Sequence, residues 1–156
     1  MAVLVTGRIL LDTNVFIDNL RSGRHATWVW GGRESRIRFL SAVVLMELRV
    51  GADTPRRRRA VDRIHTAFPI ERVVAPTAGL FDRAGALFPT LYGNTPGRWD
   101  RLGPMNDVLI ALTAWRIGAT VVTGNSGEFS QIAEHLPGLR VVAPSEEADD
   151  SRPEDG

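Results

Sequence analysis

Three acidic residues stand where apolar side chains would be expected. Glu47 lies inside the stretch SAVVLMELRVGA, Asp12 ends the apolar run RILL, and Asp107 begins the apolar part of PMNDVLIALTAW. Burying a carboxylate costs several kcal/mol unless something compensates, and carboxylates that converge repel one another. A divalent cation would relieve that repulsion. Oxygen ligands without Cys or clustered His select Mg²⁺ or Mn²⁺, so the three acids predict a metal site suited to phosphoryl chemistry.

Each of these acids also has a plainer explanation. Asp12 could cap the helix that follows it, and Asp107, near a helix N-terminus, would be favoured by the helix dipole. Glu47 could pair with Arg49 or reach solvent at the edge of its helix. Taken one by one, these explanations compete well with a metal site. The three acids together favour the metal site.

The elements that must position these acids alternate between strands and helices. Short apolar runs predict strands at residues 8–11, 37–41, 70–74, 119–123 and 139–142. Helical spacing and caps predict helices at residues 13–20, 42–51, 55–68, 76–91, 105–117 and 126–136, with residues 92–104 as a loop. This order predicts a parallel sheet with helices on both faces. Functional groups of such folds gather at the carboxyl ends of the strands, and Asp12 directly follows the first one.

Length and composition limit the classes of protein to which this chain could belong. The chain has 156 residues, 44% of them hydrophobic, and no Cys. We expect a single domain over residues 1–144. The apolar runs are too short to cross a bilayer, and the first residues lack the features of a signal peptide. The sequence therefore predicts a cytoplasmic protein without a membrane segment.

Charge is unevenly distributed along the chain. The last twelve residues, SEEADDSRPEDG, carry six acids and one Arg, and we expect residues 145–156 to form a disordered acidic tail. The formal net charge is +1, from 19 basic and 18 acidic residues. Without the tail, 18 Arg and 12 acids remain, so the body is about +6 and would attract polyanions.

Two clusters of basic residues could contact nucleic acid. Arg56, Arg57 and Arg59 belong to the run PRRRR at the start of a predicted helix. The alternative is an ordinary solvated face, in which Arg58 pairs with Asp62 one turn later.

In the second cluster, Arg98 and Arg101 flank Trp99 just before Asp107, and this group could grip a single-stranded base. The alternative is that Trp99 packs on the core while both Arg side chains face water.

Four segments resemble the PIN-domain ribonucleases, and among these the VapC-type toxins of bacterial toxin–antitoxin systems. They are LLDTNVFID, MELRVGA, NDVLIALTA and VTGNSGEF, and the resemblance runs from Ile9 to Pro144. It implies a three-layer α/β/α PIN-like fold with a mainly parallel central sheet. It also implies an endoribonuclease in which Asp12, Glu47 and Asp107 hold Mg²⁺, or Mn²⁺ in its place, and activate a water. A cognate VapB-like antitoxin and a homodimer are further implications.

The resemblance assigns supporting roles to Asn14 and Thr123 and exposes one departure. Family members often carry a fourth acid where this chain has Asn125. Asn125 or Glu128 is a candidate fourth ligand, although the pair also reads as a capping box, which we favour for Glu128. The missing acid keeps open an alternative: an inactive PIN domain that binds RNA or a partner. A phosphatase using Asp12 as nucleophile is disfavoured, because Asn14 replaces its second acid and the chain has no Lys.

Overall fold

A computed structural model describes residues 5–93 and 101–145. Five parallel strands form one sheet in the order β3-β2-β1-β4-β5. Their bounds are β1 Gly7–Leu11, β2 Arg36–Ser41, β3 Val73–Val74, β4 Thr120–Val122 and β5 Val141–Val142. The predicted parallel sheet is therefore confirmed.

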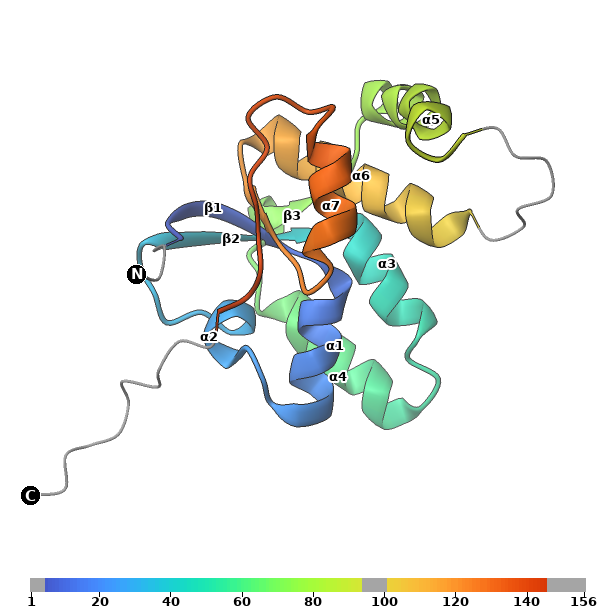
Figure 1. Cartoon of the computed structure of the whole chain (residues 1–156). Coiled ribbons are helices and arrows are strands. Elements are labelled where there is room, and N and C mark those ends of the chain that lie inside the picture. Colours follow the sequence, from blue (N-terminus) through green and yellow to red (C-terminus); the bar gives the residue numbers. More distant parts are fainter. Residues whose placement is uncertain (1–4, 94–100, 146–156) are drawn as a thin grey trace, which may run out of the picture.

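Helices cover both faces of this sheet (Figure 1). Their bounds are α1 Thr13–Ser22, α2 Ala26–Val29, α3 Ala42–Val50, α4 Pro55–Thr66, α5 Ala78–Tyr92, α6 Leu102–Ile117 and α7 Ser126–Ala133. Since crossovers between parallel strands are right-handed, the helices before β3 lie on one face and those after it on the other. The predicted three-layer α/β/α architecture is present. No helix in the described ranges is long and apolar enough to cross a membrane.

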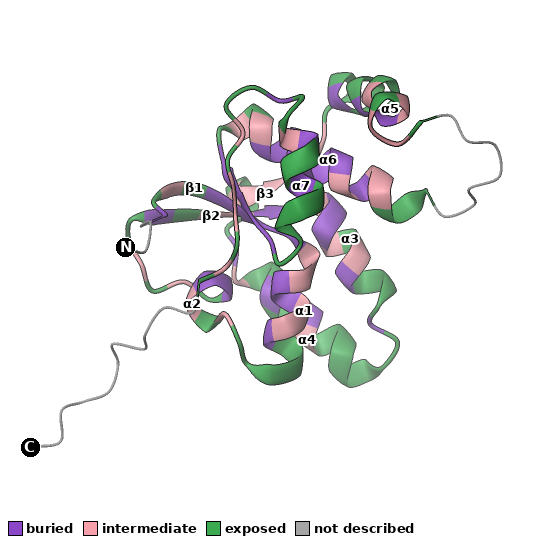
Figure 2. Ribbon diagram, viewed as in Figure 1, coloured by how far each residue is buried: buried purple, intermediate pink, exposed green. Residues whose placement is uncertain are grey.

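The innermost elements are buried on all sides. Ile9, Leu10 and Leu11 of β1 are fully buried, as expected for a parallel strand covered on both faces. The middle of α6 is an unbroken buried stretch from Val108 to Ala114. Figure 2 shows this contrast, because the outer sides of α4 and α7 are exposed.

Several predicted boundaries differ from the structure. α6 begins at Leu102, three residues before the predicted start, because Pro104 is tolerated in a first turn whose N–H groups have no helical partner. The predicted strand at residues 70–74 is a 3₁₀ turn, Ile70–Arg72, followed by the short edge strand β3. α2 was not predicted, and α7 ends at Ala133, before the turn that contains Pro137.

The strand order places a crevice beside β1. The chain proceeds from β1 to β2 and β3 on one side, then crosses to β4 and β5 on the other. Where a sheet changes direction in this way, the carboxyl ends of the two diverging strands leave an open site. Asp12 follows β1 and Thr123 follows β4, so both stand at this point.

Candidate active site

Asp12 is fixed between β1 and α1 by three hydrogen bonds. Its backbone N–H donates to Val122 O (2.9 Å), which ties it to β4. Its Oδ1 accepts from the backbone N–H of Thr13 (2.8 Å), and its Oδ2 accepts from the Thr123 hydroxyl (2.8 Å). Asp12 therefore does cap α1, but with one oxygen only. The side chain is buried, with the residue 5% exposed.

The hydroxyl of Thr123 connects the ends of β1 and β4. It donates to Asp12 and accepts from the backbone N–H of Asn125 (2.9 Å) and from Asn14 Nδ2 (3.4 Å). Asn14 Oδ1 in turn accepts from the backbone N–H of Gly124 (3.1 Å). One donor and two acceptor positions are all that a hydroxyl has, so Thr123 is saturated and holds Asp12 in one orientation.

Glu47 reaches the same place from α3. Its Oε1 accepts from the Thr13 hydroxyl (2.8 Å), so a Thr stands opposite this carboxylate. The expected alternative of a pair with Arg49 is wrong, because Arg49 pairs with Asp62 at 2.6 Å. The Asp12–Thr13 dipeptide thus contacts both β4 and α3.

Asp107 lies in the second turn of α6, and the first turn of that helix carries no acid. Stabilisation by the helix dipole therefore does not account for its position, since that effect fades within the first turn. Burial first, then the charges of Asp12, Glu128 and Glu47, raise the pKa of Asp107 from 3.8 to about 7.

Glu128 belongs with these acids. The capping box favoured from the sequence is wrong, because Asn125 makes no side-chain cap and its backbone N–H bonds to Thr123. Instead, Asn125 Nδ2 donates to Glu128 Oε2 at 2.9 Å. Glu128 also helps to raise the pKa of Asp12 and of Asp107, so its charge acts on the site.

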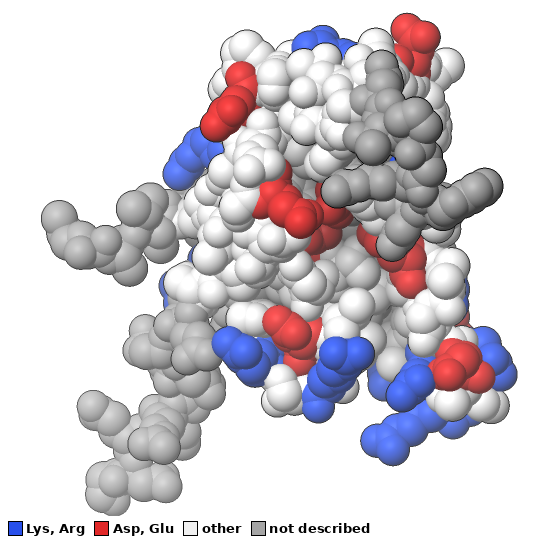
Figure 3. Space-filling view, turned by 45° about the vertical axis from the view of Figure 1, so that its right-hand side comes forward, with Lys and Arg blue, Asp and Glu red and all other residues white. Residues whose placement is uncertain are grey.

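Among the described residues, the acids gather without basic partners. Burial is the main cause that raises the pKa of Asp12, with Glu47 and Glu128 adding to it, while the bonds from Thr123 and Thr13 oppose it. Across the described ranges, none of the four acids forms an ion pair. Figure 3 shows acidic side chains near the middle of one face and Arg side chains toward its lower edge.

The chemistry of these donors suits a hard divalent cation, because carboxylate oxygens are the ligands such ions prefer. The described carboxylates are spaced more widely than the ligands of a bound metal ion. As the described side chains stand, no three acidic or His groups are close enough to share one ion. A threonine hydroxyl bonds to one oxygen of Asp12 and another to one oxygen of Glu47, and each carboxylate keeps further lone pairs that could bind a cation.

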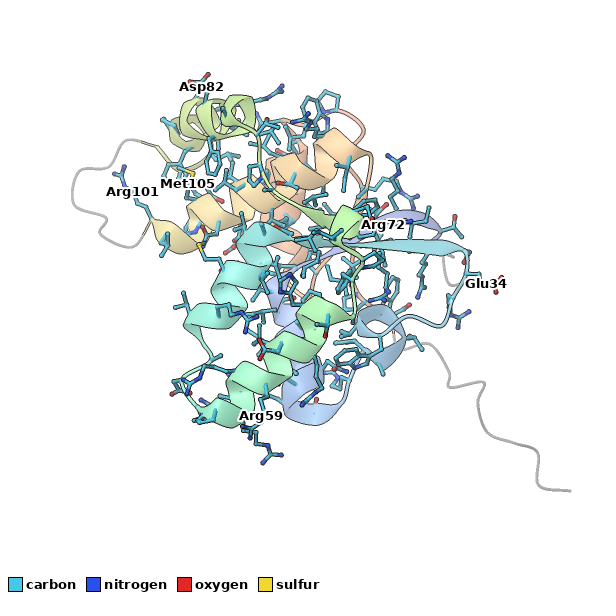
Figure 4. The ribbon with its side chains drawn as sticks, turned by 180° about the vertical axis from the view of Figure 1, so that it is seen from behind. Glu34, Arg59, Arg72, Asp82, Arg101 and Met105 are labelled. Carbon is cyan, nitrogen blue, oxygen red and sulfur yellow. The ribbon has the colours of Figure 1, made fainter. Side chains whose placement is uncertain are left out.

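The first basic cluster lies on the outer side of α4. Arg57 pairs with Asp53 at 2.6 Å, whereas Arg56 and Arg59 are exposed without an ion pair among the described residues. The expected pair between Arg58 and Asp62 is wrong, because Asp62 pairs with Arg49. Figure 4 shows Arg59 pointing away from the body of the protein. The structure therefore does not bring this cluster to the acids.

The second basic cluster is only partly visible. Arg98 and Trp99 lie outside the described residues. Arg101 occupies the N-cap position of α6, with its guanidinium 6.0 Å from the ring centroid of Phe88 on α5.

Tyr92, which the sequence predicts at the start of a loop, is a neighbour of the acids. It ends α5, and burial, followed by the charges of Asp107 and Glu128, raises the pKa of its phenol. The sequence gives only a weak indication that Tyr92 is functional: Tyr92 is the single Tyr of the chain and stands directly before Gly93.

Solved structures with a similar fold come from bacterial complexes. A chain of the DNA-bound VapBC complex from Salmonella typhimurium is 25% identical, with a TM-score of 0.59, covering 91% of this chain and 100% of that chain. A chain of FitAcB from Neisseria gonorrhoeae is 25% identical, with a TM-score of 0.58 and coverages of 87% and 97%. A chain of VapBC2 from Rickettsia felis, bound to a DNA fragment from the promoter, is 21% identical, with a TM-score of 0.62. The match covers 87% of this chain and 98% of that chain.

No protein of curated function matches this chain. A family model does: that of the PIN domain matches residues 9–135, which include Asp12, Glu47, Asp107 and Glu128. The match spans most of the sequence and contains the whole of the acidic site. The chain belongs to the PIN domain family.

Proposed function

We propose that the protein is a Mg²⁺-dependent endoribonuclease and the toxin of a toxin–antitoxin pair. The observation that carries this proposal is the convergence of Asp12, Glu47, Asp107 and Glu128. They come from four different parts of the fold to the carboxyl edge of β1 and β4, and among the described residues none of them forms an ion pair. Such an arrangement is costly to the fold, so a function must explain it.

Asp12, Glu47 and Asp107 would hold the ion, with Glu128 as a fourth acid. Mg²⁺, or Mn²⁺ in its place, supplies a polarised phosphate and a water of lowered pKa when bound. Thr123 and Asn14 fix the orientation of Asp12, and Thr13 fixes Glu47. Asn125 acts through Glu128, because its side-chain amide donates to that carboxylate.

An RNA substrate is supported by charge and by the family. The body carries about six more basic than acidic residues once the acidic tail is set aside, and this excess attracts polyanions. Arg56, Arg59 and Arg101 are candidate contacts to the RNA. Arg57 is a weaker candidate because Asp53 already neutralises it.

A VapB-like antitoxin is supported by the similar structures, which are chains of VapBC and FitAB complexes. α1 and α3 pack together and expose large apolar side chains, Leu20, Met46 and Val50, of which Val50 is 81% exposed. Exposed apolar groups of this size mark surfaces that partners cover. A homodimer in the cytoplasm would cover another such surface, with Phe81 of α5 and Leu102 of α6.

The second candidate function is an inactive PIN domain that binds RNA or a partner. It is favoured by Asn125, which stands where many relatives carry an acid, and by the loose spacing of the described carboxylates. Such a protein would bind RNA without metal and tolerate Asp12→Asn.

The test is cleavage of total cellular RNA by the purified protein with Mg²⁺, with Mn²⁺ and with EDTA. Discrete fragments that require metal and disappear in Asp12→Asn are the expected result. Asp82→Asn is the matched control, because Asp82 is exposed on α5 and points away from the site (Figure 4). Intact RNA with either metal, together with retained RNA binding, would favour the inactive binding module.

A further inference from the structure

Tyr92 occupies the end of α5 in an unusual setting. Its ring packs against Phe88, with centroids 4.8 Å apart and planes inclined by 46°. The residue is half-buried, and its hydroxyl has no hydrogen-bond partner among the residues that the structure describes. The hydroxyl is not among the buried polar atoms without a partner in the described residues, so it reaches water. One side of this ring is therefore anchored on Phe88, while the polar end lies at the surface.

The surroundings of Tyr92 join an aromatic surface to the acidic site. The charges of Asp107 and Glu128 act on its phenol, which places it beside the acids of α6 and α7. α5 and α6 pack against each other, and Arg101 at the start of α6 lies over the same Phe88 ring. Figure 4 shows Arg101 near the end of α5, with Met105 one helical turn further along α6.

A packing role alone is the competing explanation. Phe88 is buried and Tyr92 covers it, so the ring does contribute to the contact between α5 and α6. A Leu or Phe would serve that purpose equally well, without placing a hydroxyl within the field of Asp107 and Glu128. A phenol can donate to a base or a phosphate, and a partly exposed ring can stack on a base.

We propose that Tyr92, with Arg101, forms a nucleotide subsite that stacks on a base of single-stranded RNA next to the acidic site. The proposal rests on the nuclease function proposed above, because it names a contact to the same substrate. Tyr92 would act as a positioning residue: the base is held by the ring, the neighbouring phosphate is drawn toward Arg101, and the next phosphodiester reaches the acids.

The experiment uses the Asp12→Asn chain, in which one repelling charge is removed and cleavage is blocked. The probe is a fluorescein-labelled single-stranded RNA of mixed sequence, roughly ten nucleotides long, within the site sizes of single-strand binders. Affinity is measured by anisotropy in EDTA and again with Mn²⁺. Losing one base stack weakens binding by about 5- to 150-fold, so Tyr92→Ala should lose at least about fivefold.

Matched variants separate stacking from packing. Tyr92→Phe keeps the ring and should bind within about twofold of the parent. Tyr92→Leu fills the space without an aromatic face and should bind as weakly as Tyr92→Ala, which covers the case in which the Ala variant unfolds. Arg101→Ala should bind several-fold more weakly, whereas Arg116→Ala, an exposed Arg at the other end of α6, should not.

A second readout follows the residue itself. Because Tyr92 is the single tyrosine, incorporating fluorotyrosine gives one fluorine resonance to observe. This resonance should shift on adding RNA and saturate at the affinity found by anisotropy. Three results would each overturn the subsite. They are an unchanged RNA affinity of folded Tyr92→Leu, a fluorine resonance that does not shift at saturating RNA, and no RNA binding by the parent. Tyr92-dependent binding by a protein that cleaves nothing would refute the nuclease and leave the subsite standing.

Discussion

Two threonines orient the side chains of Asp12 and Glu47 in the ligand-free protein. Thr123 holds one oxygen of Asp12 and Thr13 holds one oxygen of Glu47, each at 2.8 Å. A carboxylate that accepts a hydrogen bond is favoured in its charged form, so the Thr123 hydroxyl and the Thr13 backbone N–H oppose the effect of burial on the pKa of Asp12. At this scale the site is a set of acids oriented by neutral neighbours.

Removing the Thr123 hydroxyl should disable the site without unfolding the protein. In Thr123→Val, Asp12 loses its donor and the backbone N–H of Asn125 loses its acceptor. Partners of this kind typically change activity by about 10- to 100-fold, so we expect a loss of that size in RNA cleavage, with Thr123→Ser retaining most activity. Cleavage rates and melting temperatures of both variants provide the check. Equal rates for the Val variant and the parent would show that Asp12 needs no such support.

Asp107 should make the stability of the metal-free protein depend on pH. Its pKa is about 7 in the folded chain and 3.8 in the unfolded one, so the folded state binds the proton more tightly. The stabilising proton is fully present below pH 3.8 and is lost as the pH rises to about 7. Asp107→Asn should therefore gain stability relative to the parent over this range and keep the gain above it.

Thermal melting in EDTA across this pH range measures the difference. Asp82→Asn serves as the exposed control and should follow the parent at every pH. Parallel curves for the parent and Asp107→Asn would mean that the carboxyl titrates normally in the fold.

At the scale of elements, α6 is both the most buried helix segment of the site and the carrier of Asp107. Its buried stretch from Val108 to Ala114 fixes it against the sheet, and its C-cap Gly118 turns the chain into β4. Gly118 has φ +67°, in the left-handed region where a Cβ is unfavourable. The end of this helix thus depends on a backbone conformation that glycine adopts without strain.

Two glycine substitutions should have opposite effects. Gly118→Ala forces Ala into the left-handed region and should destabilise the protein by about 1 kcal/mol. Gly85→Ala lies inside α5, where an added Cβ meets nothing within 4 Å, and should stabilise by roughly 0.5–1 kcal/mol. Chemical unfolding of the two variants beside the parent reports both values. The same sign for both would contradict this account of Gly118.

The sequence predicts the elements well where periodicity and caps are strong. Ser41 and Thr54 cap α3 and α4 as their sequence positions indicate, and the alternation of strands and helices determines the layers. The sequence predicts the position of a side chain poorly where packing between elements determines that position. The hydrogen bond between Asn125 and Glu128, and the place of Tyr92 beside α6, depend on packing that no local pattern contains.

At the scale of the whole molecule, acidic and basic side chains lie in different parts of the surface. Figure 3 shows acidic side chains near the middle of one face and Arg side chains toward its lower edge, and Arg56 and Arg59 are exposed on α4. In the proposed nuclease, the acids repel a phosphate backbone, so RNA binding would draw on basic groups elsewhere. RNA affinity should therefore fall steeply with salt.

Neutralising part of α4 should lower that salt dependence. Each lost phosphate contact reduces the slope of log affinity against log salt by about 0.7 for a single strand. We expect the double variant Arg56→Gln, Arg59→Gln to show a decrease of about twice that size in titrations at several salt concentrations. Arg83→Gln is the control, because Arg83 lies over Trp115 on the opposite layer. An unchanged slope would remove α4 from the RNA-binding surface.

The strand order has a consequence for synthesis. β1 is made before its neighbour on one side, β4, which begins only at Thr120. Until β4 leaves the ribosome, Asp12 has neither Thr123 nor the edge that orients it, and β1 is an open edge available to chaperones. During translation the acidic site is therefore assembled only after β4 and α7 have emerged.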